Sequence, residues 1–522
     1  MRKTLSATLA VTVLLGAAGA CVAQSEPRPL VAVSFAGYDR LVADIDAIGR
    51  WSGDAGLGQR LQLLLLTMPQ SDATKGPLTL ETARPWGAVL LDDKPTPVSY
   101  VFLPVADLKP LVELVQGQLS CTVKVSHGVY QIPFGKDNFY AVHKHHWAFI
   151  ANSQEELEKV AADPETLLGD LPARYGLAVR ASIRKLPEDY RRQLPSWFRP
   201  DEIDDLLLGW DVDSRTKTSY VDLELRAQTG TRLAEYLARV GPGKSDFAGL
   251  AMPDAAVAAM AAGPLSDEQV GQVSGLLAAL HASVLEQLQS QGLRGTAFRR
   301  ASRLLDAVAD ALRTAAEQKQ IDGGLAIRLD GAGGTLLAGA TLADAARLET
   351  AFRQATDEMP GNDHAAKTIA MGSETYNGVH LHTISLATPD RQFVPLVGDR
   401  LDVVVGIADH KLLIAVGRDA AAALKNAIDR LKSTGAKEVP LLKITAAVAP
   451  VARLLAKVGE APSLKAGAVM LAGLFQNDDG KGSVTLSARR IPHGVHLRLQ
   501  VDKEALKVLI SLGQMIGAYL PN

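Results

Sequence analysis

The sequence predicts an α+β fold made by tandem duplication, in which strand–strand–helix units form curved antiparallel sheets with helices on one face. Strand-like stretches alternate polar and apolar residues, as residues 220–225 do, which is the period of a sheet with one buried face. Other stretches, such as residues 343–355, carry apolar residues three and four apart, a stripe that would cover such a sheet. The same order of elements then occurs in both halves of the chain.

The duplication is visible in four pairs of segments. Residues 87–116 and 324–354 both have the order strand, turn, strand and amphipathic helix, and residues 139–160 and 401–428 both have a strand hairpin followed by a helix. Residues 218–238 and 494–513 both have a strand followed by a helix. The openings of the two halves also resemble each other, and this comparison predicts a helix over residues 255–262.

One segment breaks the duplication. Residues 266–320 contain almost no strand signal, and Ser266 with Gln269 resembles the capping box that begins a helix. We therefore predict a pair of helices inserted in the second half. The sequence "GPGKS" at 241–245 is typical of a hinge, so we expect one α+β domain over residues 28–240 and a second over residues 245–522.

The first residues are typical of an export signal, residues 1–23, with Arg2 and Lys3 before an apolar run. The run is shorter than the ~20 residues that span a bilayer. Two processing routes remain open, namely lipid attachment at Cys21 or cleavage after Ala23. The N-terminal lipid is the only membrane attachment that the sequence predicts. Both routes place the protein in the periplasm or cell envelope.

Composition argues against a nucleic-acid-binding protein. The formal net charge is −2 and aromatic residues make up 5%, so we predict no nucleic-acid binding. The chain has two cysteines. With Cys21 removed or lipidated, Cys121 has no partner, and the fold must depend on its apolar cores rather than on disulfides.

A short kernel recurs three times: His127-Gly128-Val129, Asn377-Gly378-Val379 and His493-Gly494-Val495. Each lies between two expected strands. Asn-Gly is the strongest two-residue hairpin signal, because both turn residues need positive φ, and histidine is among the residues that tolerate it. The kernel is therefore interpreted as a turn that was copied with the fold.

Histidines are the best candidates for a metal site. The candidate zinc ligands are His143, His145, His146, His380 and His382. Nothing in the sequence brings three of them together, and the duplication places His146 on His410, near a hairpin turn. The sequence has no Gly-x-Ser-x-Gly and no His-Glu-x-x-His, and "GPGKS" has Ala238 where a phosphate-binding loop needs glycine. No catalytic residue and no cofactor is predicted.

The segments "FAGYDRLVADIDAIG" (35–49) and "KGPLTLETARPWGAVLLDD" (75–93) resemble a family of uncharacterised exported proteins from planctomycete-type bacteria. The resemblance implies a signal peptide, an Arg-Pro-Trp-Gly stretch before a strand (here residues 84–87) and a duplicated α+β body. It implies no catalytic residues.

The sequence therefore predicts an exported, non-enzymatic protein that binds or scaffolds an unknown protein or an apolar ligand. One alternative is a carrier of an apolar ligand such as lipid, with residues 255–262 lining a cavity. Another is a metal-dependent hydrolase that uses the histidine clusters. No oligomeric state is predicted.

Overall fold

The computed structural model describes residues 29–53, 56–59, 80–93, 97–192, 199–241, 243–290, 294–330, 333–357, 369–388, 394–458, 462–475 and 482–519. The expected signal peptide and Cys21 lie outside these residues. The chain forms two compact units. Unit 1 combines two segments, the described residues up to Glu235 and those from Pro492 onward, and unit 2 contains Tyr236–Ile491. The C-terminal segment thus belongs to unit 1, whereas the sequence placed it in the second domain.

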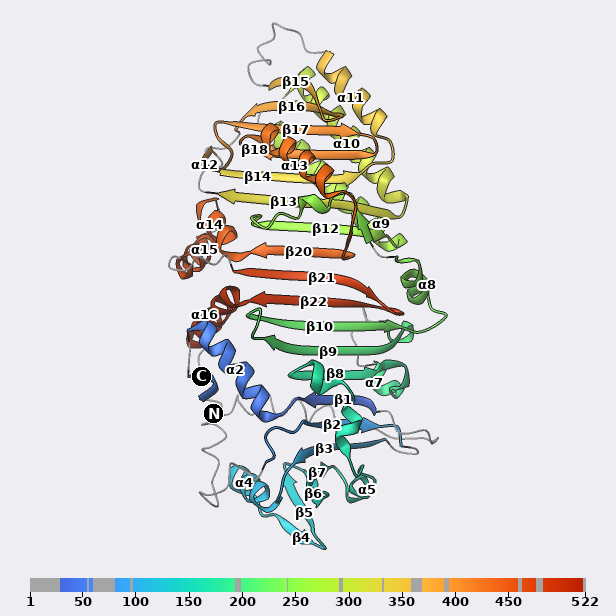
Figure 1. The fold of residues 1–522 in the computed structure, drawn as a ribbon, viewed down its shortest axis with the longest axis vertical. Coiled ribbons are helices and arrows are strands. Elements are labelled where there is room, and N and C mark those ends of the chain that lie inside the picture. The colour runs from blue at the N-terminus through green and yellow to red at the C-terminus, as the bar shows by residue number, and fades with distance from the viewer. Residues whose placement is uncertain are drawn as a thin grey trace. The chain divides into compact units, whose positions relative to one another are not determined.

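Unit 1 is an antiparallel sheet with helices packed on it (Figure 1). Its strands are β1 (Pro29–Phe35), β2 (Trp86–Leu91), β3 (Val98–Pro104), β4 (Lys124–Ser126), β5 (Val129–Phe134), β6 (Asp137–Lys144), β7 (Trp147–Ala151), β8 (Leu177–Ser182), β9 (Ile203–Asp213), β10 (Thr218–Ala227) and β22 (Gly494–Asp502). Its helices are α2 (Tyr38–Ser52), α4 (Lys109–Leu119), α5 (Gln154–Glu158), α6 (Leu171–Arg174), α7 (Glu188–Arg192) and α16 (Lys503–Tyr519). Helix α8 (Arg232–Arg239) spans the boundary between the units.

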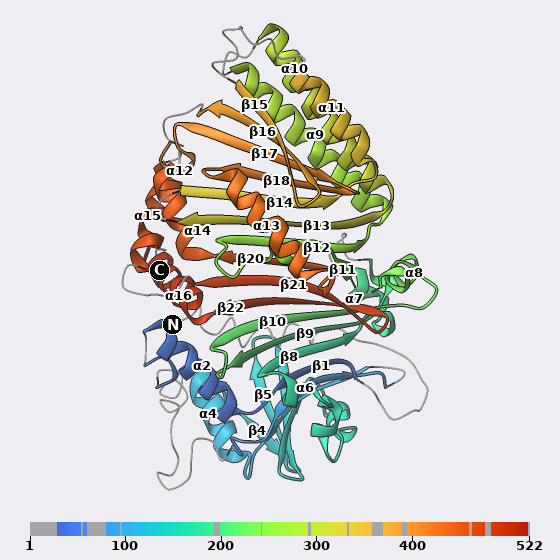
Figure 2. The same cartoon turned by 45° about the horizontal axis from the view of Figure 1, so that its top comes forward.

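Unit 2 is built in the same way, with longer helices (Figure 2). Its strands are β11 (Gly243–Ser245), β12 (Val257–Pro264), β13 (Gln320–Asp330), β14 (Gly333–Thr341), β15 (Ile369–Tyr376), β16 (Val379–Ala387), β17 (Arg400–Ala408), β18 (Lys411–Gly417), β19 (Lys437–Val439), β20 (Leu442–Ala447) and β21 (Ser483–Ile491). Its helices are α9 (Asp267–Ser290), α10 (Gly295–Glu317), α11 (Ala345–Asp357), α12 (Val394–Val397), α13 (Ala420–Thr434), α14 (Val448–Val458) and α15 (Pro462–Leu474).

The strand order confirms the duplication. In unit 1 the antiparallel order is β4-β5-β6-β7-β3-β2-β1-β8-β9, and β10 and β22 follow at the β9 end. In unit 2 the corresponding order is β15-β16-β17-β18-β14-β13-β12-β20-β21. The two orders match strand for strand, so the α+β class and the repeat predicted from sequence are confirmed.

Successive residues on a strand point to opposite faces, and this places the helices. In unit 2, the core under α13 contains Leu424 and Val404, whereas Leu304 of α10 and Phe352 of α11 pack in a second core that contains Val405. In unit 1, α5 and α4 lie in two separate clusters in the same manner. Figure 2 shows α9, α10 and α11 side by side, so the predicted helical pair is present, and it joins α11 on one face of the sheet.

Two local predictions are wrong. Residues 255–262 are not a helix, because Val257–Pro264 is strand β12 and pairs with both β13 and β20. The run of small apolar residues there fits a strand buried between neighbours, and periodicity alone does not separate these cases. The segment predicted as a hinge contains β11, which pairs with β19. A Cβ at Gly243 would lie 2.8 Å from the Ala262 carbonyl oxygen, so glycine permits this close approach.

The recurring kernel is a turn, as predicted. His127 and Gly128 both have positive φ between β4 and β5, and Asn377 and Gly378 do the same between β15 and β16. The third copy differs slightly, because only His493 has positive φ and Gly494 already belongs to β22. In the part of the chain described, no helix is both long and apolar enough to cross a membrane.

Candidate functional site

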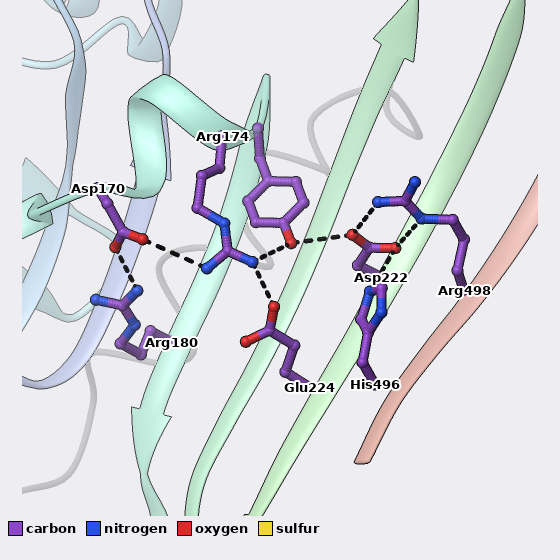
Figure 3. A network of polar contacts seen from close by, with 8 residues as sticks. Asp170, Arg174, Arg180, Asp222, Glu224, His496 and Arg498 are labelled. Atoms are coloured by element: carbon purple, nitrogen blue, oxygen red, sulfur yellow. Dashed lines mark hydrogen bonds and ion pairs between the residues drawn. The ribbon is translucent and has the colours of Figure 1, made fainter. Parts of the chain in front are cut away.

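A buried carboxylate is the centre of an extended polar network of unit 1 (Figure 3). Asp222 on β10 is 2% exposed as a side chain, and Arg498 of β22 donates to its two oxygens at 2.7 and 2.8 Å. His496 Nε2 lies 3.0 Å from Oδ1, and the Tyr175 hydroxyl donates to Oδ2 at 3.0 Å. Burial alone would raise the pKa of Asp222, but the hydrogen bonds from Arg498 and His496 hold it well below its usual range.

Strand register explains how this site forms. Asp222 and Arg498 lie directly opposite each other in the β10–β22 ladder, and Gly209 of β9 lies on the other side of Asp222. A Cβ at Gly209 would be 2.6 Å from the Tyr175 ring, so the glycine makes room for that ring above the strand. His496 projects to the same face because it is two residues from Arg498.

The network continues through alternating charges toward β8 (Figure 3). Arg174 donates to the Tyr175 hydroxyl at 2.9 Å, pairs with Glu224 and lies 3.4 Å from Asp170. Arg180 donates to the other Asp170 oxygen at 2.6 Å. Burial and the neighbouring Asp222 raise the pKa of Tyr175, so this hydroxyl keeps its proton and acts as a donor.

A second carboxylate pair lies between β9 and α2. The Arg40 guanidinium donates to Asp211 at 2.8 Å, and the Tyr220 hydroxyl donates to the other Asp211 oxygen at 3.0 Å. Asp44 of α2 is buried nearby, and its Oδ2 has no hydrogen-bond partner among the described residues. Burial and the charge of Asp211 raise the pKa of Asp44 to about 6, against the opposing effect of Arg40.

The hydrogen-bonding capacity of Asp222 is filled within the protein. Arg498 and Tyr175 hydrogen bond both carboxylate oxygens, and His496 lies 3.0 Å from Oδ1. The carboxylate is thus engaged within the protein. A buried ion pair is weak evidence for added stability, and a role in fixing which strands pair is the better-attested use. We therefore interpret the network as a structural tie between α6, β10 and β22.

The opposite face of the same strands is apolar. Register pairs define three parallel rows that cross β2, β1, β8, β9, β10 and β22, and every side chain in them is apolar. Leu208, Val221 and Leu499 on these rows are 46%, 36% and 43% exposed. The rows are Trp86-Phe35-Leu177-Trp210-Val221-Leu499, Ala88-Val33-Val179-Leu208-Leu223-Leu497 and Leu90-Val31-Ala181-Leu206-Leu225-Val495.

Unit 2 repeats this apolar face on the corresponding strands. Three rows cross β14, β13, β12, β20 and β21, and they contain only Gly, Ala, Val, Ile and Leu. Ile444 of β20 is 36% exposed on this face. The rows are Ala338-Leu325-Ala259-Ile444-Leu486, Leu336-Ile327-Val257-Ala446-Val484 and Ala340-Gly323-Ala261-Leu442-Ala488. We call these rows, in each unit, the apolar face.

The five candidate metal ligands occupy separate places. His145 and His146 form the β6–β7 turn with positive φ, while His143 hydrogen bonds the Val105 carbonyl at 3.0 Å. His380 contacts Thr375, and His382 is buried against Phe352 with Nε2 2.8 Å from Glu349. Within the described residues no group of three or more His, Cys, Asp or Glu side chains could hold a metal ion.

The equivalence of His146 and His410 is confirmed by their backbone roles. Both have positive φ in the turn of their hairpin. The His146 carbonyl accepts from the Val105 amide at 3.1 Å, and the His410 carbonyl accepts from the Leu342 amide at 2.8 Å. The histidines near this turn are therefore part of the copied hairpin.

Two other sequence features also have structural roles. Cys121 is half-buried and packs at the edge of the α4 core. In the Arg-Pro-Trp-Gly stretch, the Arg84 guanidinium lies 4.2 Å above the Trp147 ring, and Trp86 stacks on Phe35 with ring centroids 3.9 Å apart. Trp86 thereby belongs to the apolar face of unit 1.

The described part of unit 2 contains a groove and a smaller pocket. A groove of about 450 Å³ lies between α10 and α11, where Arg300, Arg303 and Arg347 accompany Asp306 and Asp310. A smaller pocket of about 290 Å³ lies where β12 ends and β13 begins, and its polar lining includes Arg239, Lys244, Gln318, Gln320 and Asp322.

Comparison with known proteins gives no assignment, because no family model matches the chain and no curated protein is similar to it. Sequence analysis did not find the Asp222 network. A signal was present, because the offset of 276 residues that places Thr218 on Gly494 also places Asp222 on Arg498. An acid and a base at equivalent positions of a duplicated strand are suited to pair when those strands meet.

Proposed function

We propose that the protein is an exported, non-enzymatic binding protein that holds an apolar partner against the apolar face of its sheets. The observation that supports this most directly is the apolar face of unit 1, whose three rows cross six strands. The row through Leu206 and Leu225 packs in a core with Ile183, and the exposed side chains lie on the other two rows. Polar side chains of the same strands gather on the opposite face, in the Asp222 network.

An antiparallel sheet commonly packs one face on a core and presents polar residues to water on the other. Here the half-exposed Leu208, Val221 and Leu499 lie on adjacent strands, two of them directly paired in register. Contiguous exposed apolar surface of this kind is typical of an interaction site. Full burial of such a side chain is worth roughly 1.5–3 kcal/mol, so covering each half-exposed one contributes about 1 kcal/mol.

The polar groups favour a binding role over a catalytic one. Asp222 is fully hydrogen bonded inside the protein, and the candidate histidines are used in turns and in a buried contact with Glu349. The apolar partner could be a protein or a small apolar ligand, and unit 2 favours the ligand, which makes the protein a carrier. Its apolar face contains the exposed Ile444 and ends at a pocket lined by cations.

The proposal is tested by titrating the full chain with Nile red, an apolar dye whose fluorescence rises on transfer from water to an apolar surface. We expect saturable binding that is weakened by the double substitution Leu208→Asn and Leu499→Asn. The matched control is Leu276→Asn, because Leu276 is a 61% exposed leucine on α9, away from the rows. Absence of binding, or equal loss in the control, would contradict the proposal.

A further inference from the structure

The smaller pocket of unit 2 lies at the end of the apolar face. Gly263 of β12 and Ile321 of β13 both line it, and they are paired in register. They continue the alternation of Ala261 and Gly323, which belong to the last of the three rows. A ligand that lies along this face therefore meets Gly263 and Ile321, two of the residues that line the pocket, at the end of the row.

The pocket differs from the face in its charge. Arg239, Lys244 and Gln320 line it, and they supply cationic and amide donors at one place. Within the described residues neither Arg239 nor Lys244 makes an ion pair, although other arginines of unit 2, such as Arg328 with Asp254 at 2.9 Å, do. The two cations therefore have donors available for an anion.

The size of the pocket suits part of a ligand. Its volume is about 290 Å³, at the lower end of the roughly 300–1,000 Å³ that small-molecule sites occupy. An anionic group fits beside the two cations, and an attached hydrocarbon chain would leave along the apolar face. The pocket and the face together therefore match the two ends of one molecule.

Resting on the proposed function, we infer that unit 2 binds an anionic lipid, with the head group between Arg239 and Lys244 and the acyl chain along β12 toward Ile444. The recognition is electrostatic at one end and hydrophobic at the other. This combination selects amphiphiles over free anions and over uncharged hydrocarbons.

One acidic residue, Asp322, also lines the pocket. Asp322 Oδ2 accepts from the Asp246 backbone amide at 3.0 Å, and its Oδ1 is buried with no hydrogen-bond partner in the described residues. Burial raises the pKa of Asp322, and a hydrogen bond from Ser245 partly opposes this. A carboxyl group with a raised pKa repels a neighbouring anion less than an ordinary aspartate does.

The test compares two fluorescent ligands that differ only in charge, cis-parinaric acid and its methyl ester, and adds inorganic phosphate as a free anion. The double substitution Arg239→Gln and Lys244→Gln should weaken binding of the acid about tenfold or more and leave the ester unchanged, since one charge-assisted hydrogen bond is worth about that factor. Ile444→Asn should weaken both ligands. The control is Lys443→Gln, because Lys443 is exposed on the same strand and points to the opposite face.

The outcomes separate the inference from the function on which it rests. If both ligands bind and the Arg239/Lys244 variant affects neither, or both equally, the anionic head-group site is wrong while the apolar face remains. If inorganic phosphate displaces cis-parinaric acid as readily as an anionic lipid would, the pocket is a site for free anions and the inference is overturned. If neither ligand binds, the proposed function fails together with the inference.

Discussion

Asp44 offers a direct test of how α2 is attached to unit 1. Its side chain is buried beside Asp211, and burial raises its pKa from an ordinary 3.8 to about 6. In Asp44→Asn the amide resembles the protonated carboxyl in size and carries no charge. The substitution should therefore remove the cost of burying an anion while leaving the packing of α2 almost unchanged.

The magnitude follows from the change in proton affinity. One pKa unit corresponds to about 1.4 kcal/mol, so a rise from 3.8 to about 6 is worth about 3 kcal/mol. The folded state binds the proton more tightly than the unfolded chain. The free energy of unfolding is therefore highest below pH 3.8, falls as the pH rises toward 6, and has lost the whole contribution above that value.

The assay is urea unfolding followed by tryptophan fluorescence between pH 4 and 7.5. All five tryptophans lie in the first 235 residues, so the signal reports on unit 1. Asp44→Asn should equal the wild type near pH 4 and exceed its free energy of unfolding by up to about 3 kcal/mol at pH 7. Asp39→Asn, an exposed change on the same helix, is the control. A wild type that becomes more stable than Asp44→Asn as the pH rises would refute the reasoning, because it would mean that Asp44 is ionised and paired with Arg40.

Three further predictions concern the same unit. Arg498→Leu leaves the Asp222 carboxylate buried without its main partner, so unfolding free energy should fall by roughly 3–5 kcal/mol in the same assay, and a loss below about 1 kcal/mol would contradict the structural tie. Gly209→Ala places a Cβ 2.6 Å from the Tyr175 ring and should destabilise unit 1 by about 1–3 kcal/mol, whereas a neutral effect would show that the ring moves freely. His146→Gly relieves a positive φ of 65° in the β6–β7 turn. The substitution should raise the free energy of unfolding by about 1 kcal/mol, which would be seen as a slightly higher thermal unfolding temperature. A loss of stability there, restored by added zinc, would instead revive the metal hypothesis.

Local patterns were sufficient to predict much of the fold. Alternation along residues 220–225 and the copied His146 and His410 turns depend on backbone geometry that neighbouring residues set, and the structure confirms both. The capping box is also confirmed, since the Gln269 backbone N–H donates to Ser266 Oγ at 3.2 Å and the Ser266 backbone N–H donates to Gln269 Oε1 at 2.8 Å. The same reasoning failed for residues 255–262, because short runs of small apolar residues fit a buried strand as well as a helix.

The candidate sites depended on contacts between distant parts of the chain. The sequence shows an aspartate at position 222 and an arginine at position 498, which are 276 residues apart. Only the β10–β22 register places Arg498 Nε 2.7 Å from Asp222 Oδ1. The apolar face is likewise a property of register, since Leu208 and Leu499 are ordinary strand leucines until β9, β10 and β22 are placed side by side. The polar–apolar alternation of a strand and the residues of a turn depend on consecutive residues, so the sequence shows them directly. Which strands pair, and in which register, depends on the free energy of the whole assembled sheet.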